Sequence, residues 1–285
     1  MTETGKLTRR TAELLLSALI IARATAYMFS KLLLQSMGQF TLLGIRSAIA
    51  FILLAVVCFP RLRKADRKDA LFGTALGASF FIVMCFELAG LKSTSSVSVS
   101  FEENTAVVLV PLLLAVLRRK MPDRHTIQIM LLCGLGIFLL NFRPDGFEFK
   151  IGDFFGMMAA FSYALTIILT ARIGAKGDPI RIGIFQVGTM AVLSLIAAFI
   201  FENPALPSGG TEWSYMLYLA IVCSAFGFTL QPFAQSGTTA ERAGVICALN
   251  PVTAAILGAL FLNETLTMKG IAGAVLILTC IIRKE

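Results

Sequence analysis

Long, uninterrupted apolar stretches run along almost the whole chain and constrain its fold more than any other feature. A helix needs about 20 apolar residues to cross the roughly 30 Å hydrocarbon core of a bilayer. The runs are continuous rather than alternating, which argues against a transmembrane barrel. We predict ten transmembrane helices, at Thr11–Leu34, Gln39–Phe59, Ala70–Leu91, Ser95–Leu117, His125–Phe142, Ile151–Arg172, Ile180–Phe201, Glu212–Gln235, Glu241–Leu262 and Thr267–Ile282.

The composition agrees with an all-α membrane protein whose connections are short. Of the 285 residues, 57% are apolar and only 15% are charged, whereas soluble domains are about half apolar and a quarter charged. The six cysteines lie singly in apolar segments and the one histidine, His125, begins a predicted helix. This spacing predicts no metal site, and we expect no cofactor.

The basic residues are distributed unevenly between the two sides of the membrane. With loops assigned alternately to the two sides, one side collects most of the lysines and arginines. The other side collects only Lys31, Lys92, Arg143, Lys150 and Lys269. The positive-inside rule therefore predicts that both termini lie in the cytoplasm, in a multi-pass protein of the cytoplasmic (inner) membrane. The formal charge of +8 is thus a topology signal, and we expect no nucleic-acid partner.

Two segments of the chain resemble each other at an offset of about 145 residues. Thr94–Leu140 aligns with Thr239–Ile282, so that Thr94 corresponds to Thr239 and Ala106 to Pro251. Each predicted repeat holds five crossings, and because five is odd the second repeat enters the membrane from the opposite side. We therefore predict two inverted five-helix repeats, residues 1–146 and 147–285, the arrangement that permits alternating access to a central site.

Three segments carry a resemblance to a known family. They are "TSSVSVSFEENTAVVLVPLL" followed by "RRKMP", "LNPVTAAILGALFLNETLT" with Asn250, Pro251, Gly258 and Glu264, and "GIRSAIAFILL" around Arg46. The chain resembles the drug/metabolite transporter superfamily, EamA type. The resemblance covers nearly the whole chain and implies a ten-helix transporter, but it does not identify a substrate.

Charged residues inside the predicted spans are candidates for function, because an ionised group near the bilayer centre needs a cavity or a partner. At about 1.5 Å per residue, Glu102, Glu103 and Arg46 lie roughly 10 to 12 Å below the outer surface, and Arg23 about 12 Å below it. Four charges from three helices thus reach one level. Glu102 and Glu103 point about 100° apart on a helix, so we expect one to face the cavity and the other an arginine.

Burial raises the proton affinity of a carboxyl group, and a nearby cation lowers it again. A single buried glutamate can therefore hold either a proton or a cationic group of a substrate, which is a mechanism for proton-coupled exchange. The alternative is that the acids neutralise Arg23 and Arg46 only to hold the helices together.

Further residues complete the candidate site. Tyr27 and Tyr163 offer aromatic faces for a cation. Asn250 precedes Pro251, which removes a helical hydrogen bond and frees a carbonyl group. Glu87 is either a site residue or an interfacial acid. The remaining uncharged candidates are Asn104 and Gln231.

We predict a secondary active transporter, not an enzyme, that moves an amino acid, amine or other organic cation or zwitterion, coupled to protons through Glu102 or Glu103. The alternative is a broad-specificity metabolite or drug exporter with structural acids. A membrane-embedded enzyme or a channel is disfavoured, because the sequence contains neither a reactive cluster nor a selectivity filter. The expected partners are the substrate, protons and lipid, and the chain is a monomer or a homodimer. The motif Gly73-Thr-Ala-Leu-Gly77 is expected to pack inside the bundle.

Overall fold

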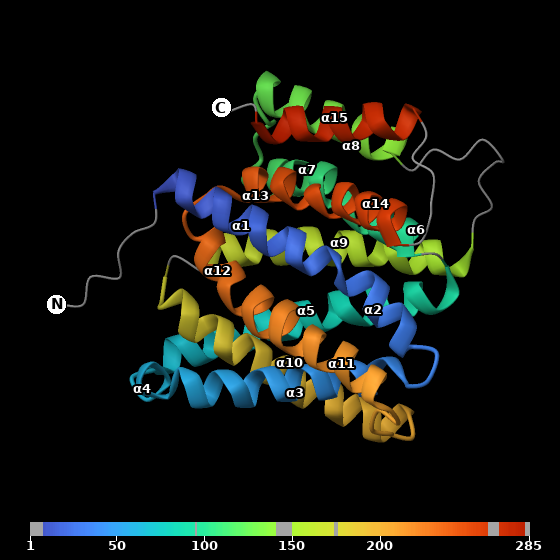
Figure 1. Cartoon of the computed structure of the whole chain (residues 1–285). Coiled ribbons are helices and arrows are strands. Elements are labelled where there is room, and N and C mark those ends of the chain that lie inside the picture. Colours follow the sequence, from blue (N-terminus) through green and yellow to red (C-terminus); the bar gives the residue numbers. More distant parts are fainter. Residues whose placement is uncertain (1–7, 95, 141–149, 174–175, 262–267, 283–285) are drawn as a thin grey trace.

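The structure is a computed structural model that describes residues 8–94, 96–140, 150–173, 176–261 and 268–282. Over these residues the regular secondary structure is helical throughout (Figure 1). The elements are α1 (Arg9–Ala24), α2 (Ala26–Leu33), α3 (Gln39–Val57), α4 (Phe59–Leu62), α5 (Arg67–Ser93), α6 (Ser96–Asn104), α7 (Ala106–Arg118), α8 (Arg124–Leu140), α9 (Ile151–Ile173), α10 (Pro179–Phe201), α11 (Gly210–Tyr218), η1 (Leu219–Phe228), α12 (Thr229–Gln235), α13 (Ala240–Cys247), α14 (Leu249–Phe261) and α15 (Met268–Ile282).

Eight stretches of helix are long and apolar enough to cross a membrane, and each coincides with a predicted span. They are Arg9–Leu33, Gln39–Val57, Arg67–Ser93, Ser98–Arg118, Ile151–Ile173, Pro179–Phe201, Gly210–Gln235 and Ala240–Leu257. The other two predicted spans are shorter apolar helices, Arg124–Leu139 and Met268–Ile282. An all-helical, multi-pass membrane protein is therefore confirmed. The predicted boundary between residues 146 and 147, and Glu264, lie outside the described residues.

Short polar side chains begin several of these helices. A side-chain oxygen at the position before a helix accepts a backbone N–H that has no partner within the helix. Asp66 does so for α5 and Asp178 for α10, where Pro179 occupies the first helical position. Thr8 and Thr239 begin α1 and α13 in the same way. These caps determine where the polar loops stop and the apolar spans start.

Three of the long spans are interrupted near their middle by a single residue. Thr25 separates α1 from α2, Thr105 separates α6 from α7, and Ala248 separates α13 from α14. The two threonines donate side-chain hydrogen bonds to carbonyls three residues earlier, Thr25 to Ala22 at 2.7 Å and Thr105 to Glu102 at 2.6 Å, and such bonds bend helices.

Proline accounts for the other interruptions. Pro251 has no N–H for the carbonyl of Cys247, the last residue of α13. Pro232 likewise has no N–H for Phe228, the last residue of the π-helical segment η1. In transporters, broken helices lie where backbone groups border a binding site, and π-helical turns are frequent at functional sites. The interruptions therefore indicate the part of the bundle in which a substrate-binding site is expected.

The helices stack in layers, with α8 and α15 as a pair at the top of Figure 1 and α3 and α10 at the opposite side. The α5–α10 contact depends on Gly73 and Gly77. A Cβ atom at Gly73 would overlap Phe185 and lie 2.7 Å from the carbonyl oxygen of Ile182, and one at Gly77 would lie 2.6 Å from the carbonyl oxygen of Gln186. The glycine motif thus packs inside the bundle, as predicted.

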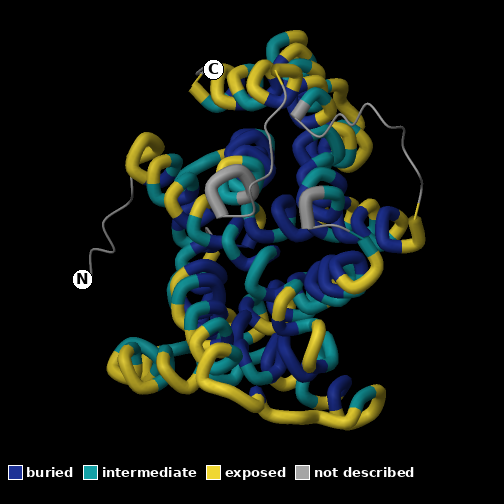
Figure 2. Tube along the Cα trace, turned by 45° about the vertical axis from the view of Figure 1, so that its right-hand side comes forward, coloured by how far each residue is buried: buried dark blue, intermediate teal, exposed yellow. Residues whose placement is uncertain are grey.

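The outer surface of the bundle is apolar, as a bilayer requires. Large hydrophobic side chains are highly exposed on the outer faces, for example Val56 at 72% and Phe199 at 74%. The buried part of the chain runs through the centre (Figure 2), and it contains charged and amide side chains as well as apolar ones. The outer faces are thus lipid-soluble, and the mainly apolar interior encloses a small number of charged groups.

The close contact of α5 with α10 predicts the effect of adding one methyl group. Gly73→Ala is expected to destabilise the protein by about 1–3 kcal/mol, since the helices must separate to admit the Cβ atom. Gly210→Ala is the matched control, because no atom lies within 4 Å of the added group. Thermal unfolding in the same detergent measures both, and equal midpoints for the two variants would contradict the packing described.

Candidate functional site

The interrupted helices meet around a buried group of polar side chains that we call the arginine cluster: Arg23, Tyr27, Arg46, Glu87, Glu103 and Gln231. Each of these residues has an exposed fraction of 7% or less. They come from α1, α2, α3, α5, α6 and α12, so elements far apart in the sequence supply one site.

Arg23 is held by an amide and by aromatic rings. Its Nη1 donates to Gln231 Oε1 at 2.7 Å. Its guanidinium carbon lies 4.5 Å from the ring centre of Phe228, 5.8 Å from that of Phe80 and 5.9 Å from that of Tyr163. A desolvated guanidinium gains up to about 2 kcal/mol from an aromatic face, so the rings replace part of the lost hydration.

Arg46 also lies near Phe228, with its guanidinium carbon 5.7 Å from the ring centre. Its Nε donates to Ser224 Oγ at 3.0 Å, from the π-helical segment η1. Among the described residues its Nη1 has no hydrogen-bond partner. Arg46 therefore retains a buried N–H group that is available to a ligand.

Two acids balance the two arginines. Glu103 Oε2 accepts a hydrogen bond from the hydroxyl of Tyr27 at 2.8 Å, whereas its Oε1 has no partner in the described structure. Glu87 lies within hydrogen-bonding reach of Glu103 and attracts both Arg46 and Arg23. The cluster thus contains two guanidinium groups and two carboxyl groups from four different helices.

A central cavity lies between these side chains. Its lining includes Arg23, Tyr27, Arg46, Glu87 and Asn250, and its volume is about 10 Å³. This is about the space that one water molecule occupies. In this conformation the cluster is therefore closed, and a metabolite enters only if helices move apart.

A much larger vestibule, of about 750 Å³, opens at one end of the bundle. It lies where α7 and α9 end and α8 and α13 begin, and its charged lining residues are Arg118, Asp123, His125, Arg172 and Glu241. Arg118 of α7 and Glu241 of α13 form an ion pair of 3.0 Å. Ile168, on the inner part of the lining, is five residues from Tyr163, or about 8 Å along α9. Closed packing separates the vestibule from the central cavity.

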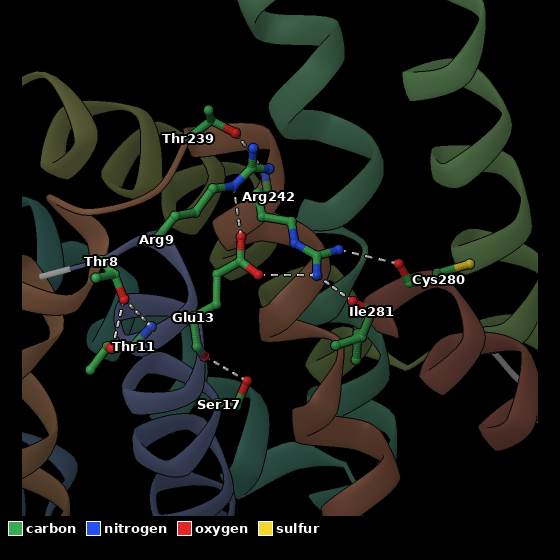
Figure 3. Close-up of polar contacts among 9 residues, drawn as sticks. All are labelled: Thr8, Arg9, Thr11, Glu13, Ser17, Thr239, Arg242, Cys280 and Ile281. Carbon is green, nitrogen blue, oxygen red and sulfur yellow. Dashed lines mark hydrogen bonds and ion pairs between the residues drawn. The ribbon is translucent and has the colours of Figure 1, made fainter. Parts of the chain in front are cut away.

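A second buried charge network, around Arg242, lies at the same end (Figure 3). Arg242 pairs with Glu13 at 3.3 Å, and Glu13 also pairs with Arg9 at 3.0 Å. The same guanidinium donates to the carbonyl of Cys280 at 3.4 Å and to that of Ile281. It thus ties the end of α15 to α1 and α13. The burial of Arg242 is decided by this packing between distant helices.

The structure separates the two neighbouring acids. Glu103 joins the arginine cluster, whereas Glu102 points to α9, against Gly156 and Asp153. We predicted that one acid faces the cavity and the other an arginine. Glu103 lies near Arg23, but Glu102 faces neither, because α6 turns it to the opposite helix. Glu87, which the sequence left open as an interfacial acid, is 3% exposed and lines the central cavity instead.

The other predicted residues lie at or near the same level. Asn250 lines the cavity, and its Oδ1 has no partner among the described residues. Tyr163 has its ring near Arg23 and its hydroxyl 3.3 Å from Cys247 Sγ. Asn104 is turned back on its own helix, where its amide donates to the carbonyl of Ser100 at 2.6 Å.

Sequence reasoning missed Phe80, Phe228 and Ser224, which contact the two arginines. Phe228 had one usable signal, because it lies four residues before Pro232, where the helical bond is missing. Phe80 and Ser224 have no comparable signal.

Apolar helices that enclose a charged site beside broken helices define a membrane transport protein. A model of the EamA-like transporter family matches residues 10–142 and again residues 150–282, and the chain belongs to this family. An uncharacterised transporter of Archaeoglobus fulgidus is 26% identical over 95% of this chain and 84% of its own length. The threonine/homoserine exporter RhtA of Escherichia coli is 27% identical over 84% of this chain and 79% of its own length.

A solved crystal structure that is 18% identical superposes with a TM-score of 0.79, over 96% of this chain and 96% of that one, and it supports the fold. The family and the names of the relatives are those of transporters rather than enzymes. The chain is therefore a multi-pass membrane transporter with a small-molecule substrate.

Two glutamines on α12 permit a matched test of how Arg23 is held. Gln231→Leu is expected to destabilise the protein by about 1–3 kcal/mol, because it leaves a buried N–H of Arg23 without its acceptor. Gln235 is equally buried, but its amide has no partner among the described residues. Gln235→Leu is therefore expected to be neutral or stabilising. Thermal unfolding of both variants provides the comparison, and a larger loss for Gln235→Leu would refute the role given to Gln231.

Proposed function

We propose that this protein is a secondary active transporter that moves a small zwitterion, an amino acid or related amine, across the cytoplasmic membrane by alternating access. The observation that carries the proposal is the balanced charge of the arginine cluster. Two buried guanidinium groups and the buried carboxyl group of Glu87 line one cavity, and the buried carboxyl group of Glu103 lies within hydrogen-bonding reach of Glu87. A zwitterion presents one charge to each kind of group, so neither charge enters the membrane uncompensated.

Free hydrogen-bonding atoms give the ligand a specific orientation. We assign the carboxylate of the substrate to Arg46, whose Nη1 lacks a partner in the described part of the chain, and the ammonium to Glu103, whose Oε1 also lacks one. Charge-assisted hydrogen bonds of this kind are shorter and stronger than neutral ones. We assign the apolar part of the substrate to Phe228, which lines the cavity and has its ring near both arginines.

The topology in this proposal has ten crossings in two inverted halves, residues 1–146 and 147–285, with both termini in the cytoplasm. The eight long spans and the two shorter apolar helices supply ten candidates. The same family model matches once in each half. The start of α1 and the end of α15 also lie at one end of the bundle, where Arg242 connects them. By the positive-inside rule this end is cytoplasmic, and the vestibule then opens to the cytoplasm.

Coupling to protons follows from competition at Glu103. The arginines and the substrate ammonium favour its charged form, and burial favours its protonated form. When the substrate leaves, a proton replaces it, so proton movement in one direction is linked to substrate movement in the other. The similarity to a threonine/homoserine exporter supports amino acids as the first substrates to test.

Counterflow in proteoliposomes tests the function directly. Wild-type protein is expected to exchange labelled threonine or homoserine against unlabelled internal substrate, and an imposed pH gradient is expected to accelerate the uptake. Glu103→Gln removes a charged acceptor worth about 1.5–3 kcal/mol, so substrate affinity should fall by about tenfold to a hundredfold. Dependence on the pH gradient should disappear as well.

Glu212→Gln is the control, since that acid lies at an exposed end of α11 and bonds to Ser208. Exchange by Glu103→Gln that keeps the wild-type affinity and pH response would favour the alternative, a broad-specificity exporter in which the acids only neutralise Arg23 and Arg46. The absence of exchange for every amino acid and amine tested would reject the substrate class.

A further inference from the structure

Glu102 belongs to a second acidic site, on the other side of α6 from the arginine cluster. Its exposed fraction is 4%, and that of Asp153 on α9 is 3%. The two carboxyl groups lie within hydrogen-bonding reach of each other. Both carboxyl oxygens of Glu102 are buried without a hydrogen-bond donor among the described residues. A carboxylate in this position has lost its hydration, and no hydrogen bond from the described residues compensates for that loss.

Gly156 makes room for this arrangement. A Cβ atom at position 156 would overlap Glu102 Oε2 and would lie 2.9 Å from Glu102 Cβ. The side chain of Glu102 therefore occupies the space that any other residue at position 156 would fill. This contact holds the carboxyl group against α9, one helical turn from Asp153.

Basic groups on the surrounding helices are exposed, as Lys92 of α5 is, or are engaged elsewhere or lie far along their helices. Lys31 of α2 donates to the carbonyl of Thr94 at 2.6 Å. On α5, Glu87 belongs to the arginine cluster. The described part of α14 has no charged residue, and Arg118 of α7 and Arg124 of α8 lie at the vestibule end. Asp153 accepts a hydrogen bond from the backbone N–H of Lys150, whose side chain is exposed.

Two ionised carboxylates cannot hydrogen-bond to each other, because both are acceptors only. If one of them is protonated, its O–H group becomes the donor. The second carboxylate then accepts the bond, and the repulsion between two buried negative charges is removed. We propose that Glu102 and Asp153 hold one proton between them, as a proton-binding site separate from the arginine cluster. This inference does not depend on the substrate or on the transport direction proposed above.

Labelling with dicyclohexylcarbodiimide tests the site, because this reagent modifies protonated carboxyl groups in apolar surroundings. Purified wild-type protein is expected to be modified at Glu102 at neutral pH, and less so as the pH rises. Asp153→Asn removes the like charge, so the pH at which labelling of Glu102 is half lost should fall by one unit or more. Gly156→Ala should reduce labelling at neutral pH by displacing the carboxyl group. Glu103→Gln should leave the labelling of Glu102 unchanged.

Infrared spectroscopy gives a second measurement that needs no access for a reagent. A carbonyl band of a protonated carboxylic acid is expected at neutral pH in wild-type protein, and this band should lose intensity in Glu102→Gln. Glu102→Gln retains the shape of the side chain, so the comparison does not depend on a disruptive change. The proposal is overturned if this band is the same in both proteins, or if the pH profile of labelling is the same in Asp153→Asn as in wild type. Neither readout uses substrate, so a failed transport assay leaves this test intact.

Discussion

The burial of two guanidinium groups inside a lipid-soluble bundle is the constraint on which the rest of this structure depends. Arg23 and Arg46 are 7% and 1% exposed, and an unpaired charge at such depth is unstable. The structure compensates them with the ring of Phe228, which lies near both, with Gln231 and Ser224 as acceptors, and with Glu87 and Glu103 as nearby acids. These groups come from separate helices, so the arginines fix how those helices are arranged around the centre.

The interruptions of the helices serve the same site. Thr25, Thr105 and Ala248 break three spans beside residues of the cluster or its cavity, and Pro232 ends the π-helical segment that carries Ser224 and Phe228. Each break places side chains at positions that a straight helix would not offer. The central cavity is nevertheless almost filled, at about 10 Å³, while the vestibule is large. The protein is therefore seen with its charged site closed and one end of the bundle open.

The sequence was sufficient to predict the apolar helices and the common level of the site residues, because both depend only on position along the chain. Apolar length predicts a crossing, and the number of residues from a helix end predicts depth. Arg23, Arg46 and Glu103 were accordingly predicted to lie at one level, and they do lie together. The partners of these residues were not predictable in the same way. Glu102 and Glu103 are adjacent, and only the rotation of α6 decides that one faces the arginines and the other faces Asp153.

By itself the sequence determined that the chain is a helical membrane protein, which segments enter the bilayer and which charges enter with them, since hydropathy and charge act locally along the chain. The tertiary structure alone decided which charges meet. It brought Glu87 into the cavity, buried Arg242 against α1 and α15, and left Glu102 with an acid for a neighbour. The physical reason is that helix rotation and crossing arise from packing between distant segments. Examples are Gly73 of α5 against α10 and Gly156 of α9 against α6, and these contacts cannot be predicted from a local sequence pattern.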